Sequence, residues 1–269
     1  CEILDARIPL ASRNPDVDEL TAGKPRLVVL NRVDQADPGQ TRRWAAYFRE
    51  KGYAVLEANA KGGAGTAQFA AAVRELLRDK LEAYAQKGQV GRVVRVMVLG
   101  IPNVGKSTFI NSFAGAARAK AANKPGVTRG KQWITVDDYD LMDMPGVLWK
   151  KFDSLETATN LAFIGSIKDD ILDIEELACG LLSGVRVIYP QRLMERYKLD
   201  EQALALPPYD LLQAIGARRG MLISGGEVDT ERAAKMLVGE FRASKWGRIS
   251  LERPPQRDDL ADFAEEDDE

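Results

Sequence analysis

A glycine-rich segment that follows a β-branched run holds the clearest chemical pattern in this chain. Residues 100–108 read GIPNVGKST, which fits the phosphate-binding loop G-x-x-x-x-G-K-[ST]. Its glycines allow the backbone to wrap a phosphate group with N–H groups pointing inward, and the following helix N-terminus adds positive potential. We expect Lys106 to bind the β- and γ-phosphates and the Ser107 hydroxyl to bind Mg²⁺. The expected nucleotide contacts in this segment are Asn103, Val104, Gly105, Lys106, Ser107 and Thr108.

A second pattern, D-M-P-G over residues 143–146, follows a short apolar run. A carboxylate at the end of a strand suits the water shell of a bound metal ion, and a glycine N–H can contact a γ-phosphate. We therefore expect Asp143 to bind Mg²⁺ through water and Gly146 to contact the nucleotide. D-x-x-G alone is a common turn, but its place one strand–helix–strand interval after the phosphate loop favours the functional interpretation.

A third pattern, N-R-V-D over residues 31–34, directly follows the apolar run 27–30. The Asp34 carboxylate can accept hydrogen bonds from the N1–H and 2-amino groups of guanine, whereas adenine lacks both donors. Adenine would leave the carboxylate unpaired, so such a site rejects it by polarity rather than shape. We expect Asn31, Arg32 and Asp34 to bind the base, although N-x-x-D on its own is also an ordinary strand-end turn. A weaker set of expected contacts, with the Ala60 N–H offered to guanine O6, is Asn59, Ala60 and Lys61.

These patterns need elements that bring them together, and the chain predicts an α/β fold with a largely parallel sheet. Short apolar runs alternate with amphipathic helical segments, which is typical of helices packed on the faces of such a sheet. We predict strands at residues 27–30, 54–57, 93–99, 133–136 and 139–142, and helices at 41–51, 67–87 and 108–114. The run 93–99 is the candidate for a central strand. Asp137-Asp138 joins the last two strands as an antiparallel pair.

The sequence changes character after Gly146 and becomes mainly helical from about residue 167. We predict an α/β nucleotide-binding domain over residues 1–170, a small all-helical domain over 171–253 and an acidic, disordered tail over 254–269. The tail holds eight acidic residues and one basic residue, so the rest of the chain carries a net charge of +5. A basic body is consistent with a polyanionic partner.

Composition excludes several classes of protein. The 269 residues include no histidine, so no histidine acid, base or metal ligand is present in this chain. Two cysteines cannot form a disulfide framework. No apolar run has the length of a membrane span and no signal peptide opens the chain, so we expect a cytoplasmic protein without a membrane partner. The first residue, Cys1, lies in a strand-like run, which suggests that the natural N-terminus is missing and leaves an organellar location open.

The order of the motifs is shifted, because the base-reading pattern precedes the phosphate loop and D-M-P-G comes last. A parallel sheet with adjacent termini tolerates such a permutation without moving any strand. The set resembles the circularly permuted GTPases of the ribosome biogenesis GTPase A family. The matching segments are residues 5–9, 12–15, 31–34, 100–108, 124–128, 143–146, 165–169 and 224–226.

This resemblance implies a circularly permuted P-loop GTPase domain followed by the helical domain. It implies that the chain binds and hydrolyses GTP, with GTP, GDP and Mg²⁺ as its ligands, and acts in assembly of the large ribosomal subunit. By the same resemblance Thr128 is the switch threonine that contacts the nucleotide and closes on Mg²⁺, and Asn103 helps to hold K⁺. The implied partners are the large subunit or its precursor and rRNA, with a monomer expected away from the ribosome.

Three departures from the usual GTPase pattern bear on activity. Arg32 stands where most GTPases have Lys, and its aliphatic stem can still cover the base. Val147 stands where many GTPases have a water-orienting glutamine, and the histidine-bearing N-terminal segment of the family is not in these residues. Lys106 and Thr128 can support transition-state charge and metal, but no side chain that positions water is evident. We therefore expect slow hydrolysis that the ribosome stimulates.

The helical domain carries a modest basic surplus, with 12 basic and 9 acidic residues between positions 180 and 253. A solvated helical surface explains that charge equally well, and the family resemblance is what favours rRNA. Two other functions stay open. An ATP-using metabolic P-loop enzyme is disfavoured by Asn31 and Asp34. An RNA-binding scaffold with a degenerate pocket is disfavoured by the intact Lys106, Ser107, Thr128 and Asp143.

Overall fold

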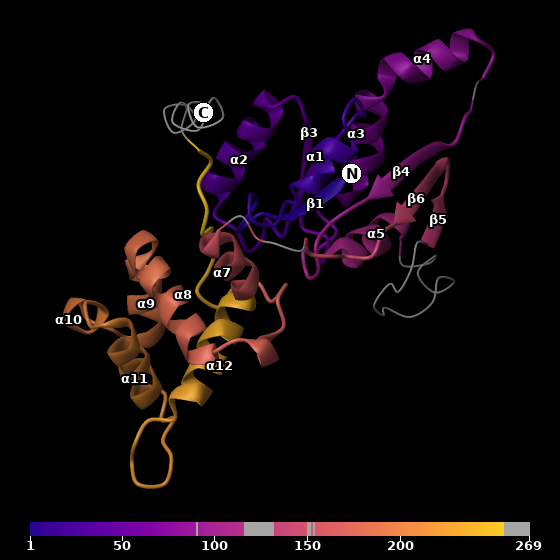
Figure 1. Cartoon of the computed structure of the whole chain (residues 1–269). Helices are drawn as coiled ribbons and strands as arrows, with labels where there is room; N and C mark the ends of the chain where they lie inside the picture. Colours follow the sequence, from indigo (N-terminus) through magenta and orange to yellow (C-terminus); the bar gives the residue numbers. More distant parts are fainter. Residues whose placement is uncertain (90, 116–131, 150–151, 153, 256–269) are drawn as a thin grey trace, which may run out of the picture.

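The protein consists of a sheet flanked by helices and a second group of helices connected to it (Figure 1). This computed structural model describes residues 1–89, 91–115, 132–149, 152 and 154–255. The predicted switch segment 124–128 and nearly all of the acidic tail therefore lie outside the described residues. Among the described residues, no helix is sufficiently long and apolar to cross a lipid bilayer.

The strands of the described part fall into two sets of three. Their bounds are β1 Glu2–Asp5, β2 Leu27–Asn31, β3 Ala54–Ala58, β4 Val94–Val98, β5 Gln132–Val136 and β6 Tyr139–Asp143. The first set is parallel in the order β1-β2-β3, and the second has the order β4-β6-β5 with only β5 antiparallel. An isolated parallel bridge between Glu2 and Leu99 links the sets, with the Ile3 N–H donating to the Leu99 carbonyl at 2.9 Å. The spatial order is therefore β3-β2-β1-β4-β6-β5.

This order confirms the predicted α/β architecture and its permutation. The strand that leads into the phosphate loop, β4, lies between β1 and β6, as expected for a central strand. Parallel strands end at one edge of a sheet, so the loops after β2, β4 and β6 meet there. The three motifs are thus close in space although residues 31–34, 100–108 and 143–146 are far apart in the chain.

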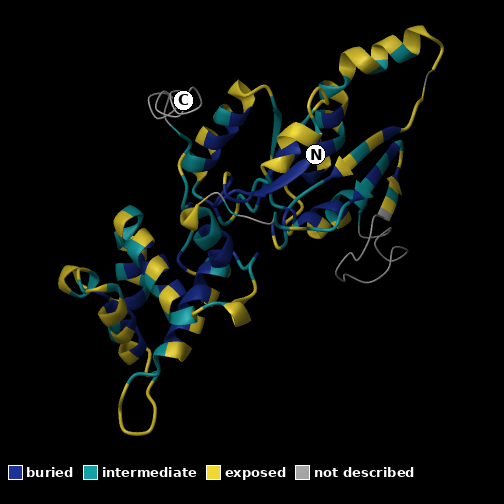
Figure 2. Ribbon diagram, viewed as in Figure 1, coloured by how far each residue is buried: buried dark blue, intermediate teal, exposed yellow. Residues whose placement is uncertain are grey.

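Helices cover both faces of the sheet because side chains alternate along each strand. Leu4 and Leu30 point to one face and pack with Trp44 of α2. Ile3 and Val29 point to the other face, where Phe69 of α3 and Phe109 of α5 also pack. β1 and β2 are buried along their whole length (Figure 2). The helices of this part are α1 Asp16–Leu20, α2 Pro38–Glu50, α3 Phe69–Leu76, α4 Arg78–Gln86 and α5 Lys106–Ala114.

In the second group of helices, α8 packs against α7, α11 and α12, and their buried residues continue the hydrophobic cluster of the sheet. Leu181 and Val185 of α8, Ile215 of α11 and Leu237 of α12 are almost completely buried there. The bounds are α7 Leu155–Phe163, α8 Ile174–Ile188, α9 Pro190–Tyr197, α10 Glu201–Leu204, α11 Pro208–Arg218 and α12 Thr230–Arg242. The predicted domain division near residue 170 places α7 with the sheet, although α7 packs on α8 and α12.

The predicted single helix over residues 67–87 is wrong in one respect. A short 3₁₀ turn, Thr66–Gln68, precedes α3, and the helix breaks at Leu77 before α4. α3 buries Phe69 and Val73, whereas α4 has no buried residue and extends away from the sheet (Figure 1). Helical spacing of apolar residues continues through the break, but in α4 only Leu81 packs, partly buried, against the core of the described part.

Candidate nucleotide-binding site

The phosphate loop connects β4 to α5, as the sequence predicts. Gly105 precedes the first residue of α5 and has a φ of +90°, which favours glycine. A Cβ atom at this position would lie 2.5 Å from the Asn31 Nδ2 atom. Both the backbone conformation and the close approach of the base-reading motif therefore require glycine here.

Lys106 and Asp143 meet inside the loop. The Lys106 Nζ atom donates to Asp143 Oδ1, and both side chains are only 6% exposed. Ser107 and Thr108 lie in the first turn of α5 and are exposed. The structure thus brings together the expected phosphate-binding lysine, the expected metal-binding serine and the carboxylate at the end of β6.

The D-M-P-G turn lies directly against the phosphate loop. A Cβ atom on Gly146 would lie 3.1 Å from the Pro102 nitrogen and 3.2 Å from the Gly100 carbonyl oxygen. The Met144 N–H also donates to the Val98 carbonyl at 3.3 Å, at the end of β4. Movement of this turn and movement of the phosphate loop are therefore sterically linked.

The donor set fits Mg²⁺, which prefers oxygen ligands and usually keeps several waters. A hydroxyl from Ser107 and a carboxylate from Asp143 are hard oxygen donors, and these two side chains would hold the ion. The described residues contain no cluster of three or more acidic or cysteine side chains suited to a metal. Such a site depends on nucleotide phosphates and water for its remaining ligands. The expected threonine ligand, Thr128, lies outside the described residues.

Asn31 links the base-reading motif to the phosphate loop. Its Nδ2 atom donates to the Val104 carbonyl at 2.8 Å, and its Oδ1 atom accepts from the Ala60 N–H at 3.0 Å. Asn31 is 2% exposed. Its role in this structure is therefore to hold three loops together at the edge of the sheet.

In this structure the Ala60 N–H is bonded to Asn31, and its expected donation to guanine O6 stays a prediction. Asn59 also forms a hydrogen bond within its own loop, since its Oδ1 atom accepts from the Gly62 N–H at 2.9 Å. Lys61 is exposed beside them. The loop after β3 therefore lies beside the base-reading motif, but Ala60 contributes to its architecture.

Arg32 has a φ of +63° and extends across the mouth of the site. Its NH2 group donates to the Asn103 carbonyl at 2.6 Å, and its Nε atom lies 3.7 Å from Asp5 Oδ2. Asp34, two residues later, is exposed. The guanidinium of Arg32 is thus held against the phosphate loop, and the exposed carboxylate of Asp34 interacts electrostatically with Arg32.

Asp5, at the end of β1, is a site residue that the motif analysis did not single out. It is completely buried and bonds Arg7 through Oδ1 at 2.9 Å and Oδ2 at 2.7 Å. Burial alone would raise the pKa of Asp5, but Arg7 and Arg32 hold that pKa below its ordinary value. The carboxylate therefore stays charged and anchors Arg32. An Asp and an Arg two residues apart at the end of an apolar run were the available signal.

Asn103 has a φ of +65°, and its Nδ2 atom donates to the Gly165 carbonyl. Ser166, which follows Gly165 in the chain, donates its hydroxyl to the Pro102 carbonyl at 2.6 Å. Asn103 therefore faces the segment that leads from α7 to α8 in this structure. Its expected role in K⁺ binding stays a prediction.

Comparison with known proteins agrees with this geometry. A family model described as 50S ribosome-binding GTPase matches residues 95–201. The chain is 43% identical over 95% of its length to a ribosome biogenesis GTPase A of Bacillus cereus, of which it covers 86%. The chain belongs to the ribosome biogenesis GTPase A family. It is therefore a GTPase, and the permuted motif order is a property of this family's fold.

More distant relatives extend the comparison. A mouse protein named mitochondrial ribosome-associated GTPase 1 is 36% identical over 94% of this chain, which covers 82% of that relative. A GNP-bound crystal structure of YlqF from Thermotoga maritima matches with a TM-score of 0.62 and 26% identity, over 95% of this chain and 92% of that one. A GDP-bound YlqF structure matches with a TM-score of 0.63 and 26% identity, over 94% and 92%. Guanine nucleotides are thus the ligands of this fold.

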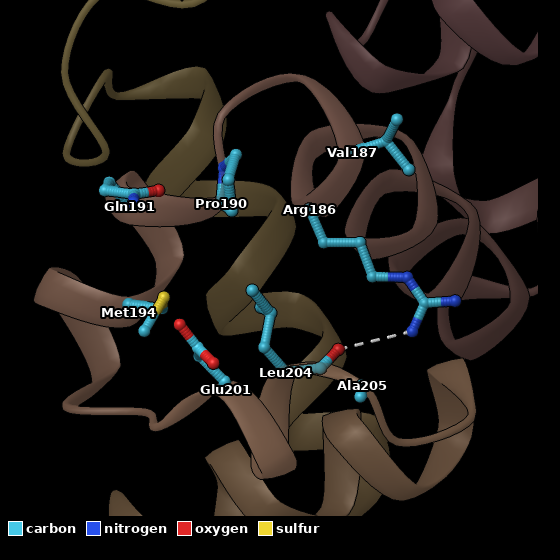
Figure 3. A pocket seen from close by; sticks show the side chains of 8 residues that line it. All are labelled: Arg186, Val187, Pro190, Gln191, Met194, Glu201, Leu204 and Ala205. Carbon is cyan, nitrogen blue, oxygen red and sulfur yellow. Dashed lines mark hydrogen bonds between the residues drawn. The ribbon is translucent and has the colours of Figure 1, made fainter.

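The helical part has an open pocket of its own between α8, α9 and α10 (Figure 3). Arg186 lines it and donates from NH1 to the Leu206 carbonyl at 2.6 Å and to the Leu204 carbonyl at 3.4 Å. None of the nucleotide-site residues lines this pocket. Arg186 thus uses its guanidinium to fasten one backbone segment to another inside the helical part.

Proposed function

We propose that this GTPase binds GTP with Mg²⁺, associates with the large ribosomal subunit or its precursor through rRNA contacts, and leaves after hydrolysis. One observation carries the proposal. The backbone of the phosphate loop is hydrogen-bonded at Pro102 to Ser166, and Asn103 is bonded to Gly165, in the segment that enters the helical part. A shift of the phosphate loop between its GTP-bound and GDP-bound forms would therefore be transmitted through these hydrogen bonds to the helices.

That route continues into α12 through Arg242. Its Nε atom donates to the Phe163 carbonyl at 3.0 Å and its NH2 group to the Ala162 carbonyl at 2.8 Å, at the end of α7. The same guanidinium forms two bonds of 2.7 Å to the Asp169 carboxylate. A cation at a helix C-terminus satisfies its free carbonyls and is favoured by the helix dipole. Arg242 therefore joins the loop that touches Pro102 to the core of the helical part.

The chemistry of the site supports slow hydrolysis in isolation. Lys106 would bind the β- and γ-phosphates and stabilise charge as it develops on the γ-phosphoryl oxygens. Bound Mg²⁺, held by Ser107 and Asp143, would neutralise further phosphate charge. Val147 is 63% exposed, and its apolar side chain cannot orient a water molecule. A group supplied by the partner is expected to complete the site, which is worth about 10³- to 10⁵-fold in rate for other GTPases.

The names of the relatives and the charge of the helical part support a ribosomal partner. The Bacillus and Thermotoga relatives are named ribosome biogenesis GTPase A, and the matching family model is named for 50S binding. Phosphate contacts dominate the affinity of proteins for nucleic acids. Basic residues of the helical part that could make such contacts include Arg192, Lys198, Arg232 and Lys245. Arg186, Arg242 and Arg248 already donate to backbone carbonyls within the protein.

Single-turnover GTP hydrolysis with and without large ribosomal subunits, in KCl and in NaCl, tests this proposal. We expect a slow basal rate, a large increase on addition of subunits, and a higher rate in K⁺ than in Na⁺. Ser166→Ala should reduce the stimulation more than the basal rate, because it removes the bond to Pro102. Ser183→Ala is the matched control, since Ser183 bonds only within α8, to the Cys179 carbonyl at 2.8 Å. A fast basal rate that subunits do not raise would overturn the proposal.

A further inference from the structure

After α12 the chain returns to the sheet and runs along the base-reading loop, towards α2 (Figure 1). We call residues 248–250 the return segment and residues 33–37 the base-reading loop. Arg248 donates from NH2 to the Val33 carbonyl at 2.7 Å and from Nε to the Ala36 carbonyl at 2.8 Å. The two segments are more than 200 positions apart in the sequence.

Two further hydrogen bonds join the same segments, and a third ties the return segment to Ala6. The Ile249 N–H donates to the Gln35 carbonyl at 2.9 Å. The Ser250 hydroxyl accepts from the Asp37 N–H at 3.1 Å and donates to the Ala6 carbonyl at 3.4 Å. Ile249 and Ser250 are 1% and 2% exposed, so these bonds are shielded from water.

The bonded groups lie on both sides of Asp34. Val33 precedes it, and Gln35 to Asp37 follow it, so the return segment fastens the loop at four backbone positions. Asp34 itself is exposed; among the interactions found in the described part of the chain, its carboxylate has a charge attraction to Arg32 but no hydrogen bond. Its position in space therefore depends on the backbone that carries it, and that backbone is held from the side of the helical part.

We propose that the return segment positions Asp34 for guanine, and that through it the helical part sets the affinity and specificity of the site for the base. This inference rests on the proposed role of Asp34 in base recognition. Arg248 is a positioning residue, since it acts through the loop and does not reach the nucleotide.

The proposal separates two kinds of coupling between the nucleotide and the helices. The contacts of Ser166 and Gly165 reach the phosphate loop, where GTP differs from GDP. The return segment reaches the base-reading loop, where GTP and GDP are identical. Breaking the contacts of the return segment should therefore weaken the binding of GTP and of GDP by the same factor. Because binding linkage is reciprocal, a partner that displaces the helical part would release both nucleotides alike.

The test measures dissociation constants of the whole chain for GTP, GDP and IDP. Inosine nucleotides keep N1–H but lack the 2-amino group, so the ratio of IDP to GDP dissociation constants reports the contact to Asp34. We expect Arg248→Ala to weaken GTP and GDP equally, by about three- to ten-fold, if the loop is correctly placed only a tenth to a third of the time. The affinity for IDP should fall by a smaller factor, so the ratio of IDP to GDP dissociation constants should decrease. Arg248→Lys should restore part of the loss, because an ammonium can reach one carbonyl but not two.

Matched controls exclude a general effect on the helical part. Arg186→Ala also removes two hydrogen bonds from a guanidinium to backbone carbonyls, here in the pocket of Figure 3. It should leave the dissociation constants for GTP, GDP and IDP unchanged. Ser250→Ala should act in the direction of Arg248→Ala, whereas Ser183→Ala should not. Circular dichroism and thermal melts check that each variant is folded.

Three results would overturn the inference. The first is an IDP to GDP ratio that Arg248→Ala does not change. The second is an equal loss of affinity in Arg186→Ala, and the third is a loss confined to GTP. Asp34→Asn separates this failure from that of base recognition itself. If Asp34→Asn leaves the ratio of IDP to GDP dissociation constants unchanged, Asp34 does not bind the base. If Asp34→Asn changes this ratio but Arg248→Ala does not, base recognition by Asp34 stands and only the role of the return segment is refuted.

Discussion

Replacing Lys106 with Met should destabilise the protein before any nucleotide is added. The Lys106 ammonium contacts Asp143, and both side chains are 6% exposed. Removing one member of a buried ion pair costs about 3 to 5 kcal/mol when the remaining charge is left uncompensated. Asp143 keeps a further interaction besides the one with Lys106. The site opens towards the nucleotide, so we expect the lower end, about 3 kcal/mol in the free energy of unfolding. For a protein of this size the melting temperature should fall by roughly 6 to 12 °C.

The double variant Lys106→Met/Asp143→Asn distinguishes stability from phosphate binding. A neutral amide removes the buried charge, so half or more of the lost stability should return. Nucleotide affinity should stay at least ten- to a hundred-fold below that of the unchanged chain, because a charge-assisted bond worth about 1.5 to 3 kcal/mol is still missing. Lys106 would then have two roles that one single variant cannot separate.

The assay is urea and thermal unfolding without nucleotide, followed by nucleotide titration of the same preparations. Lys235→Met is the matched control, because Lys235 pairs with Glu231 on the surface of α12 with both side chains 64% exposed. It should not change the melting temperature measurably. Equal stability of the Lys106 and Lys235 variants would refute the reasoning, as would a double variant less stable than Lys106→Met.

Three other predictions follow from the structure. Asp34→Asn should shift the preference from guanine to xanthine nucleotides, with GTP affinity reduced by about 1.5 to 3 kcal/mol, and competition between GTP and XTP measures it. Burial raises the pKa of Glu252 to about 7 despite hydrogen bonds from the Leu10 and Ala11 N–H groups. The protonated carboxyl therefore contributes stability that is fully present below about pH 4.5 and is lost as pH rises through 7. Between pH 5 and pH 8 the free energy of unfolding should decrease by about 2 to 3 kcal/mol, and Glu252→Gln should abolish the decrease. An equal decrease in that variant would contradict the prediction. Gly105→Ala should weaken nucleotide binding at least ten-fold, whereas Gly52→Ala, with a φ of +84° but no atom near its Cβ position, should not.

The motifs could be predicted because each is contiguous and its role is local. Lys106, Ser107 and Asp143 follow strands whose apolar runs are visible in the sequence, and parallel strands end at one edge. The break at Leu77 could not be predicted in the same way. Helical spacing continues past it, and the low burial of α4 is not visible in the sequence.

Contacts between distant segments were also hidden. The expected contact of Asn31 with the base stays a prediction, whereas its bonds to Val104 and Ala60 could be known only once three loops had converged. Arg248 was counted among the basic residues of a helical surface. Its bonds to the base-reading loop depend on the path of the chain after α12, which charge and spacing do not specify.

The most direct test of the central claim is co-sedimentation of the chain with large ribosomal subunits or their precursors, in GDP and in a non-hydrolysable GTP analogue. The account predicts binding with the analogue, release with GDP, and no nucleotide dependence in the Lys106→Met/Asp143→Asn variant. Equal sedimentation of the unchanged chain in both nucleotides, or none in either, would contradict a nucleotide-dependent role on the ribosome.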